Sequence, residues 1–221
     1  MCVVGKKGVG AASFIGGADG PTTVFFARED NTNITIQQRI QRMRNRARRK
    51  RIIKSLKANA HTMDQVAEYI MNELGYSEID KSDSQYREEY CQMRASFLLQ
   101  YHPSLLGELS EAPQLKSHDE KSVKIFFEQL EKRQKAAEDI PTDLFDIDLH
   151  IYKKKEKNLE SSITIEKKYE YIGGSASGSN RSMKKYKALF RKIYLYYGVT
   201  QKDIDEHTKR YDDVVRTLAL R

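Results

Sequence analysis

The sequence predicts a mainly α-helical protein with one or two small β-hairpins, that is, an α+β fold. The first observation is that apolar residues recur at steps of three and four along several segments between 35 and 218. The second is that apolar and polar residues alternate between 147 and 171. The third is the composition, because 39% apolar and 32% charged side chains in 221 residues allow a modest core.

Residues 1–34 are rich in glycine and are expected to form a separate N-terminal segment, in which strands at 1–4 and 22–27 would make a small hairpin. Asp19 lies among glycines and Pro21 follows, which predicts a tight backbone corner. Such a corner is typical of an aspartate turn that caps its own backbone. It is also able to bind a cation through the carboxylate and nearby carbonyl oxygens.

The string Ile-Gly-Gly-Ala-Asp-Gly-Pro-Thr at 15–22, followed by Val24, Phe25 and Phe26, resembles the β subunit of sodium-translocating decarboxylases. In that family the motif lies in an interrupted intramembrane segment, and its aspartate is implicated in sodium and proton coupling. The resemblance implies that Asp19 is a sodium ligand, and it covers about 15 of the 221 residues. Apart from sodium under this hypothesis, no cofactor is expected.

No transmembrane insertion is expected, although residues 8–27 are long enough to span a bilayer. That stretch contains Asp19, Pro21 and several glycines. The two cysteines, Cys2 and Cys91, have no metal-binding spacing and form no disulfide framework, which indicates a cytoplasmic location. Cys91 falls on the apolar side of a predicted helix, so we expect its side chain to be buried.

Residues 35–60 are predicted to form a basic helix. Thr35 and Gln38 have the spacing of a capping box. Apolar residues recur from Ile36 to Ala47 and resume at Ile52. Ten basic residues and no acidic residue lie between 36 and 57, and the other 29 of the 39 Lys and Arg are outnumbered by 31 Asp and Glu. The excess positive charge of the chain therefore belongs to this helix.

Cations on nearly every side of one helix indicate either a solvated helix that contacts acidic parts of its own chain, or a helix that binds a polyanion. Phosphate backbones are the usual polyanion. The predicted partner is therefore nucleic acid or an acidic protein. The candidate binding residues are Arg39, Arg42, Arg44, Arg46, Arg48, Arg49, Lys50, Arg51 and Lys54.

Residues 61–140 are expected to form a helical domain. Thr62 and Gln65 mark the start of its first helix, and Pro103 ends its second. Ser117 is predicted to cap the third. The apolar faces are Tyr86, Tyr90, Met93, Phe97 and Tyr101 on the second helix and Val123, Phe126, Phe127 and Leu130 on the third. Core packing is favoured over base stacking for these aromatic side chains.

Residues 141–172 are predicted to form a β-hairpin with Leu149 and Ile151 on its buried face and His150 on its solvated face. A polar connection is expected at 153–162, although a helix through 153–160 is the competing interpretation. Residues 173–181 are rich in Gly and Ser and are predicted to be a flexible joint. Residues 182–221 then form a helical hairpin, whose second helix is capped by Thr200.

Enzyme chemistry has little support, because the five histidines are scattered and Asp146 and Asp148 share a solvent face. The leading hypothesis is a non-enzymatic soluble binding protein whose basic helix engages nucleic acid or an acidic partner. One alternative is an accessory or relic of a sodium-translocating decarboxylase β subunit. The other is a structural or assembly protein that forms an oligomer through its aromatic helices.

Overall fold

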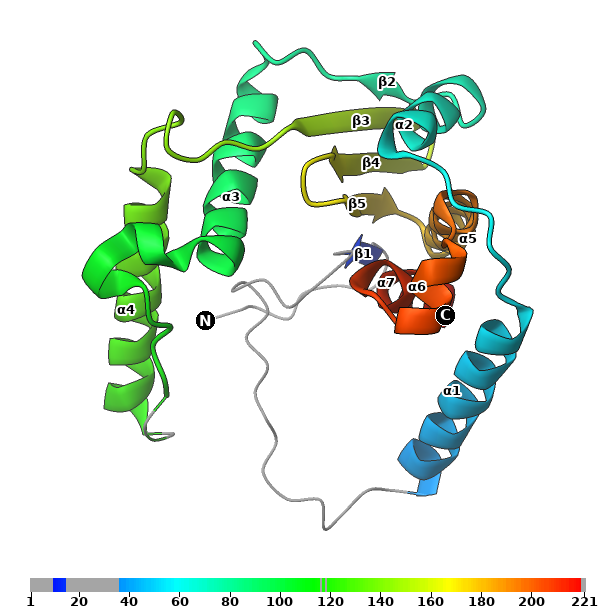
Figure 1. Ribbon diagram of the computed structural model, residues 1–221, viewed down its shortest axis with the longest axis horizontal. Coiled ribbons are helices and arrows are strands. Elements are labelled where there is room, and N and C mark those ends of the chain that lie inside the picture. Colours follow the sequence, from blue (N-terminus) through cyan, green and yellow to red (C-terminus); the bar gives the residue numbers. More distant parts are fainter. Residues whose placement is uncertain (1–9, 15–35, 116, 118, 220–221) are drawn as a thin grey trace. The chain divides into compact units, whose positions relative to one another are not determined.

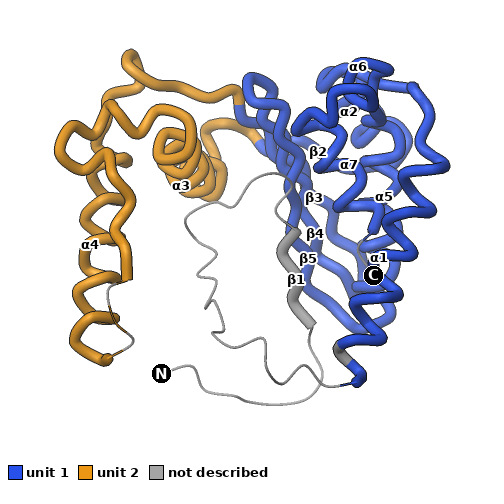
Figure 2. The backbone as a smooth tube through the Cα atoms, turned by 60° about the horizontal axis from the view of Figure 1, so that its bottom comes forward, with its two compact units in different colours: residues 1–17, 27–79, 149–221 blue, residues 18–26, 80–148 orange. Residues whose placement is uncertain are grey.

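The computed structural model describes residues 10–14, 36–115, 117 and 119–219, and these residues form a helix-rich α+β fold as predicted (Figure 1). The chain divides into two compact units. Unit 1 comprises residues 1–17, 27–79 and 149–221, and unit 2 comprises residues 18–26 and 80–148 (Figure 2). The units divide the chain differently from the predicted segments, because unit 1 is assembled from stretches on both sides of unit 2.

Unit 1 contains a five-stranded antiparallel sheet in the order β1-β5-β4-β3-β2. The strands are β1 (Gly10–Phe14), β2 (Ser77–Glu78), β3 (Leu149–Glu156), β4 (Leu159–Glu166) and β5 (Tyr171–Gly178). The helices of this unit are α1 (Ile36–Ser55), α2 (Met63–Asn72), α5 (Asn180–Tyr197), α6 (Gln201–Glu206) and α7 (Lys209–Ala219). Helices α2, α5 and α7 lie on one face of the sheet, where Ile163, Ile165 and Ile193 are fully buried (Figure 2).

The β-region is larger than the predicted hairpin. Strands β3 and β4 run through most of the predicted polar connection and leave only Lys157 and Asn158 as the turn. Residues 173–178, predicted to be a flexible joint, are instead part of β5, which pairs with both β1 and β4. The reason lies on α5, where Tyr186 donates a hydrogen bond of 3.0 Å to the carbonyl oxygen of Ser162. A Cβ on Gly174 would lie 2.3 Å from that tyrosine oxygen, so the glycine allows close packing.

The prediction that the side chain of His150 is solvated is wrong. Its side chain is 16% exposed, and its Nδ1 atom lies 2.6 Å from a carboxylate oxygen of Glu78. The neighbour is supplied by β2, which pairs with β3 and covers that edge of the sheet. Residues that alternate along β3 are therefore not divided into a solvated and a buried face of the sheet, since the neighbours Ile151 and Tyr152 are both buried.

The segment that follows α1 is fixed to the turn between α5 and α6. The amide of Asn59 donates to the carbonyl oxygen of Val199 at 3.0 Å. Arg210 donates through Nη2 to the carbonyl oxygens of His61 and Tyr197 at 2.7 and 2.6 Å. Its guanidinium also lies 3.8 Å from the centre of the Tyr197 ring. These contacts hold the C-terminal end of α1 in place on unit 1.

Unit 2 contains α3 (Ser84–Tyr101), the 3₁₀ helix η1 (Pro103–Leu109) and α4 (Glu120–Glu138). Two predictions for these helices are wrong. Cys91 is an exposed free thiol, although helical spacing places it on the same side of α3 as the buried Ala95 and Leu98. On α4, Phe127 is 42% exposed, and the buried residues are Arg133 and Ala137.

Two buried arginines organise unit 2 by donating to backbone carbonyl groups. Arg133 donates to the carbonyl oxygens of Leu109 and Ser110 at 2.9 and 2.8 Å, and so caps the C-terminal end of η1. Arg94 donates in the same way to Phe145, at 2.8 Å, and to Ile140. Burial lowers the pKa of Arg133, and these carbonyl contacts offset part of that penalty.

Arg133→Leu is expected to lower the free energy of unfolding by about 2–4 kcal/mol, because two carbonyl groups lose their donor. The matched control is Lys132→Leu at an exposed neighbouring position, which should change the value by no more than about 0.5 kcal/mol. Urea unfolding followed by circular dichroism measures both variants. Equal effects in the two variants would show that Arg133 has no capping role.

Candidate nucleic-acid interface

Helix α1 carries all nine candidate binding residues on 20 residues that include no acidic side chain. Arg48 is half-buried, and the other eight are exposed. Lys54 lies in the last turn, where a cation interacts favourably with the helix dipole. Thr35, the predicted capping residue, lies outside the described residues. The structure therefore presents the predicted cations along one continuous helix.

The apolar residues of α1 occupy two opposite faces. Ile36, Ile40 and Met43 are 77%, 43% and 69% exposed. Ile52, by contrast, is partly buried against the core of unit 1. Because each helical residue turns by about 100°, Ile52 lies about 160° around the helix from Ile36. The interrupted stripe seen in the sequence is thus two stripes, of which only the second packs against the protein.

The acidic residues of the chain neutralise little of α1. Arg49 is 3.3 Å from Asp212 of α7, and both side chains are more than half exposed. Within the described part of the chain, no other ion pair involves the nine candidate residues. Exposed pairs of this kind contribute little free energy and are screened by salt. The positive charge of α1 therefore remains available to a partner.

Helix α5 is a second cationic helix that the sequence analysis missed. It contains six basic residues and no acidic one, namely Arg181, Lys184, Lys185, Lys187, Arg191 and Lys192. With the nine of α1 this makes 15 of the 39 Lys and Arg, so the remaining 24 face 31 Asp and Glu and have a net charge of −7. The signal was present in the sequence, because no acidic residue occurs from 171 to 202.

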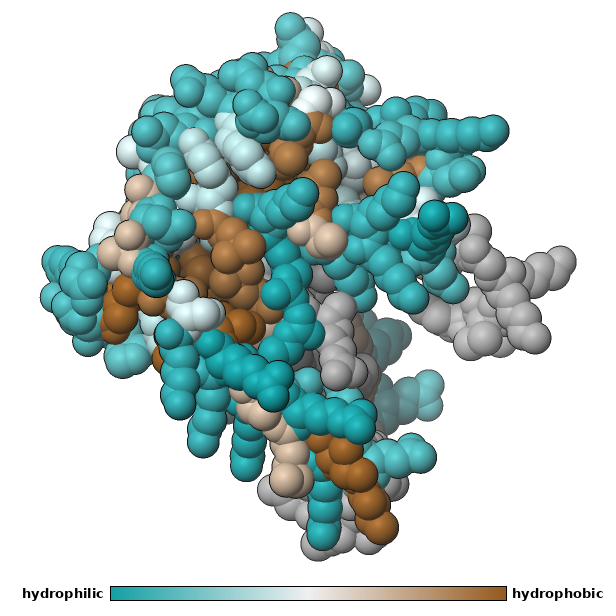
Figure 3. All heavy atoms as spheres, turned by 90° about the vertical axis from the view of Figure 1, so that its right-hand side faces the viewer, coloured by the Kyte–Doolittle hydropathy of each residue, from teal (hydrophilic) through white to brown (hydrophobic). Residues whose placement is uncertain are grey.

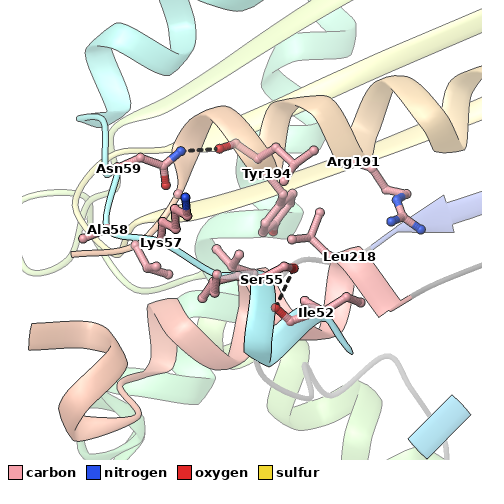
Figure 4. A pocket seen from close by; sticks show the side chains of 13 residues that line it. Ile52, Ser55, Lys57, Ala58, Asn59, Arg191, Tyr194 and Leu218 are labelled. Carbon is pink, nitrogen blue, oxygen red and sulfur yellow. Dashed lines mark hydrogen bonds between the residues drawn. The ribbon is translucent and has the colours of Figure 1, made fainter. Parts of the chain in front are cut away.

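A groove of about 500 Å³ is lined by the C-terminal end of α1, the segment that follows it, α5 and α7. Its lining includes the apolar Tyr194, Val214 and Leu218 together with the cationic Lys57 and Arg191. Figure 4 shows Lys57 on the segment after α1 and Arg191 on α5. On that segment the side-chain amide of Asn59 donates to a carbonyl oxygen of α5, that of Leu195, at 3.3 Å. The groove thus joins the two cationic helices.

Two cations are held near each other beside this groove. Burial lowers the pKa of Arg191, and the positive charge of Arg48 lowers that pKa further. Like charges in proximity repel, and the repulsion is relieved when an anion binds between or beside them. Arg48 of α1 and Arg191 of α5 therefore both contribute positive potential on this side of unit 1.

The predicted sodium ligand Asp19 lies outside the described residues, so the structure does not place it. Within the described residues, no group of three or more His, Cys, Asp or Glu side chains is arranged to hold a metal ion. Among the helices that the structure describes, none is both long and apolar enough to cross a membrane.

Comparison with known proteins adds no assignment. No family model, curated protein or solved structure matches the chain.

Proposed function

We propose that the protein is a non-enzymatic, cytoplasmic binding protein whose helix α1 engages the phosphate backbone of nucleic acid. The observation that carries this proposal is the charge of α1, with nine cations and no acid in 20 residues. Binding to phosphates releases the counterions condensed on the nucleic acid, which supplies most of the affinity of such contacts. Among the described residues, the exposed pair of Arg49 with Asp212 is the one ion pair of these nine cations, and it leaves most of their charge available to a partner.

The length and continuity of the charge favour nucleic acid over an acidic protein. At about 1.5 Å per residue, a helix of 20 residues is about 30 Å long. Cations repeat along the whole of that length, and Arg191 of α5 adds a further cation beside its C-terminal end. A phosphate backbone offers negative charge at regular short intervals over the same distance. The length of α1 and the repetition of its cations therefore match a phosphate backbone.

Binding of the full chain to a labelled duplex and a labelled single strand, measured over a salt series, tests the proposal. With six phosphate contacts, affinity is expected to fall about a thousandfold between 50 and 200 mM salt. Polyaspartate serves as the acidic control without phosphates and is expected to bind more weakly. Absent or salt-insensitive binding to both nucleic acids would refute the proposal. Tighter binding to polyaspartate would point to an acidic protein partner instead.

A further inference from the structure

We propose that α1 enters the major groove of B-form DNA, with Ile36, Ile40 and Met43 directed toward the base edges. This inference rests on the proposed nucleic-acid function and names the class of nucleic acid and the face that contacts it. It accounts for the exposure of these three side chains, which are 77%, 43% and 69% exposed on a helix that is otherwise strongly charged. We refer to these three residues as the apolar stripe.

Two rows of cations flank the apolar stripe. Rotation of about 100° per residue places both rows within about 40–120° of the stripe, one on each side of it. The first row is Arg39, Arg46 and Lys50, and the second is Arg44, Arg48 and Arg51. The major groove has a complementary arrangement of negative charge, because a phosphate backbone runs along each of its two edges and the base edges lie between them. Each row would therefore face one strand.

The diameter of α1 and its orientation on unit 1 are also compatible with binding in the major groove of DNA. A helix with its side chains is about 10–12 Å in diameter, and the major groove is about 12 Å wide. Ile52 packs on the core from the side opposite the apolar stripe, and Arg49 meets Asp212 of α7. DNA can therefore approach the stripe without displacing α1 from unit 1. The lower part of Figure 3, where α1 lies, shows hydrophobic side chains among hydrophilic ones.

The apolar stripe predicts which bases are preferred. Thymine presents its 5-methyl group in the major groove, and apolar side chains make favourable contacts with that methyl group. Uracil lacks the methyl group, and the major groove of double-stranded RNA is too deep and narrow to admit a helix. We therefore expect thymine-containing DNA duplexes to bind more tightly than duplex RNA.

The test compares two DNA duplexes that differ only in the thymine methyl groups. The full chain is titrated with a thymine-rich duplex and with the same duplex in which deoxyuridine replaces every thymidine. The deoxyuridine duplex is expected to bind about three- to tenfold more weakly, because buried methyl groups contribute to affinity. A duplex RNA of the same sequence should bind more weakly still.

The variant that removes the apolar stripe is Ile36→Ser/Ile40→Ser/Met43→Ser. It should bind both DNA duplexes equally, and its salt dependence should be unchanged because every cation remains. The matched control is Ile125→Ser/Leu144→Ser, which alters exposed apolar residues (45% and 61%) of unit 2 and should keep the preference for thymine. Unchanged thermal midpoints verify that both variants fold.

Three outcomes would overturn the inference. Equal binding of the two DNA duplexes by the unmodified chain, with normal salt dependence, would refute it and leave the proposed function standing. Absence of binding to any nucleic acid would refute both. If instead the serine variant keeps the thymine preference but loses binding to vesicles that contain phosphatidylglycerol, the apolar stripe contacts a lipid surface and not DNA.

Discussion

Charge reversal of Arg48, Arg49 and Arg51 to Glu is expected to weaken binding to a DNA duplex at least about a hundredfold at low salt. The three side chains lie in the C-terminal half of α1, where Arg49 is 3.3 Å from Asp212 of α7 and the positive charge of Arg48 lowers the pKa of Arg191 on α5. Reversal removes three cations and adds three groups that repel phosphate. Fluorescence anisotropy over a salt series should also show that the slope of log affinity falls by about 2.7, or 0.9 for each lost contact.

The control for this prediction is an equal change of charge elsewhere. Lys124, Lys132 and Lys135 are exposed on α4 in unit 2, and their reversal to Glu changes the net charge by the same amount. This variant should bind within about threefold of the unmodified chain, since long-range effects of exposed charges are screened by salt. Equal losses in the two variants would show that net charge, and not α1, governs binding.

Gly174→Val is expected to lower the free energy of unfolding of unit 1 by about 4 kcal/mol. A Cβ at this position would lie 2.3 Å from the hydroxyl oxygen of Tyr186 and 2.7 Å from the carbonyl oxygen of Ser162. Tyr186 is 1% exposed and donates to that carbonyl group, so it cannot move without breaking a buried hydrogen bond. Urea unfolding followed by circular dichroism measures the loss.

Ser177→Val is the matched control for Gly174→Val on the same strand. Ser177 is exposed, and valine is favoured in strands, so its effect should lie within about 0.5 kcal/mol of zero. The two variants together separate the strand from the flexible joint that the sequence predicts. If Gly174→Val proves as neutral as Ser177→Val, residues 173–178 behave as a joint and the packing of Tyr186 on β5 is refuted.

The starts of the helices were predicted well from the sequence, because a capping side chain and the backbone amide it binds are within one helical turn of each other. The Thr62 side chain accepts from the amide of Gln65 in the capping box that the sequence predicts. Thr200 caps α6 as expected. At α4 the prediction differs by two residues, because Asp119 is the cap and the Ser117 hydroxyl accepts from the amide of Asp119. A carboxylate and a hydroxyl so close in sequence compete for the same role.

The predictions that were wrong concern features that depend on residues far away in the sequence. Glycines at 173 and 174 can indicate flexibility or close approach, and only Tyr186 on another element shows which applies. Likewise, the periodicity of α1 does not show which of its two apolar faces meets the core. The exposure of Ile36 and Met43 follows from the tertiary position of Ile52. The apolar stripe could therefore not be assigned to solvent from the sequence.

Hydrogen exchange of the backbone amides, with and without a saturating DNA duplex, tests most directly whether α1 is the binding site. Exposed helices exchange through local opening, and a bound partner slows that opening. We expect exchange to slow along residues 36–55 and more weakly along α5, with no change along α3 and α4. Unchanged exchange in residues 36–55 under conditions where the duplex is bound, or protection confined to residues 80–148, would contradict the account.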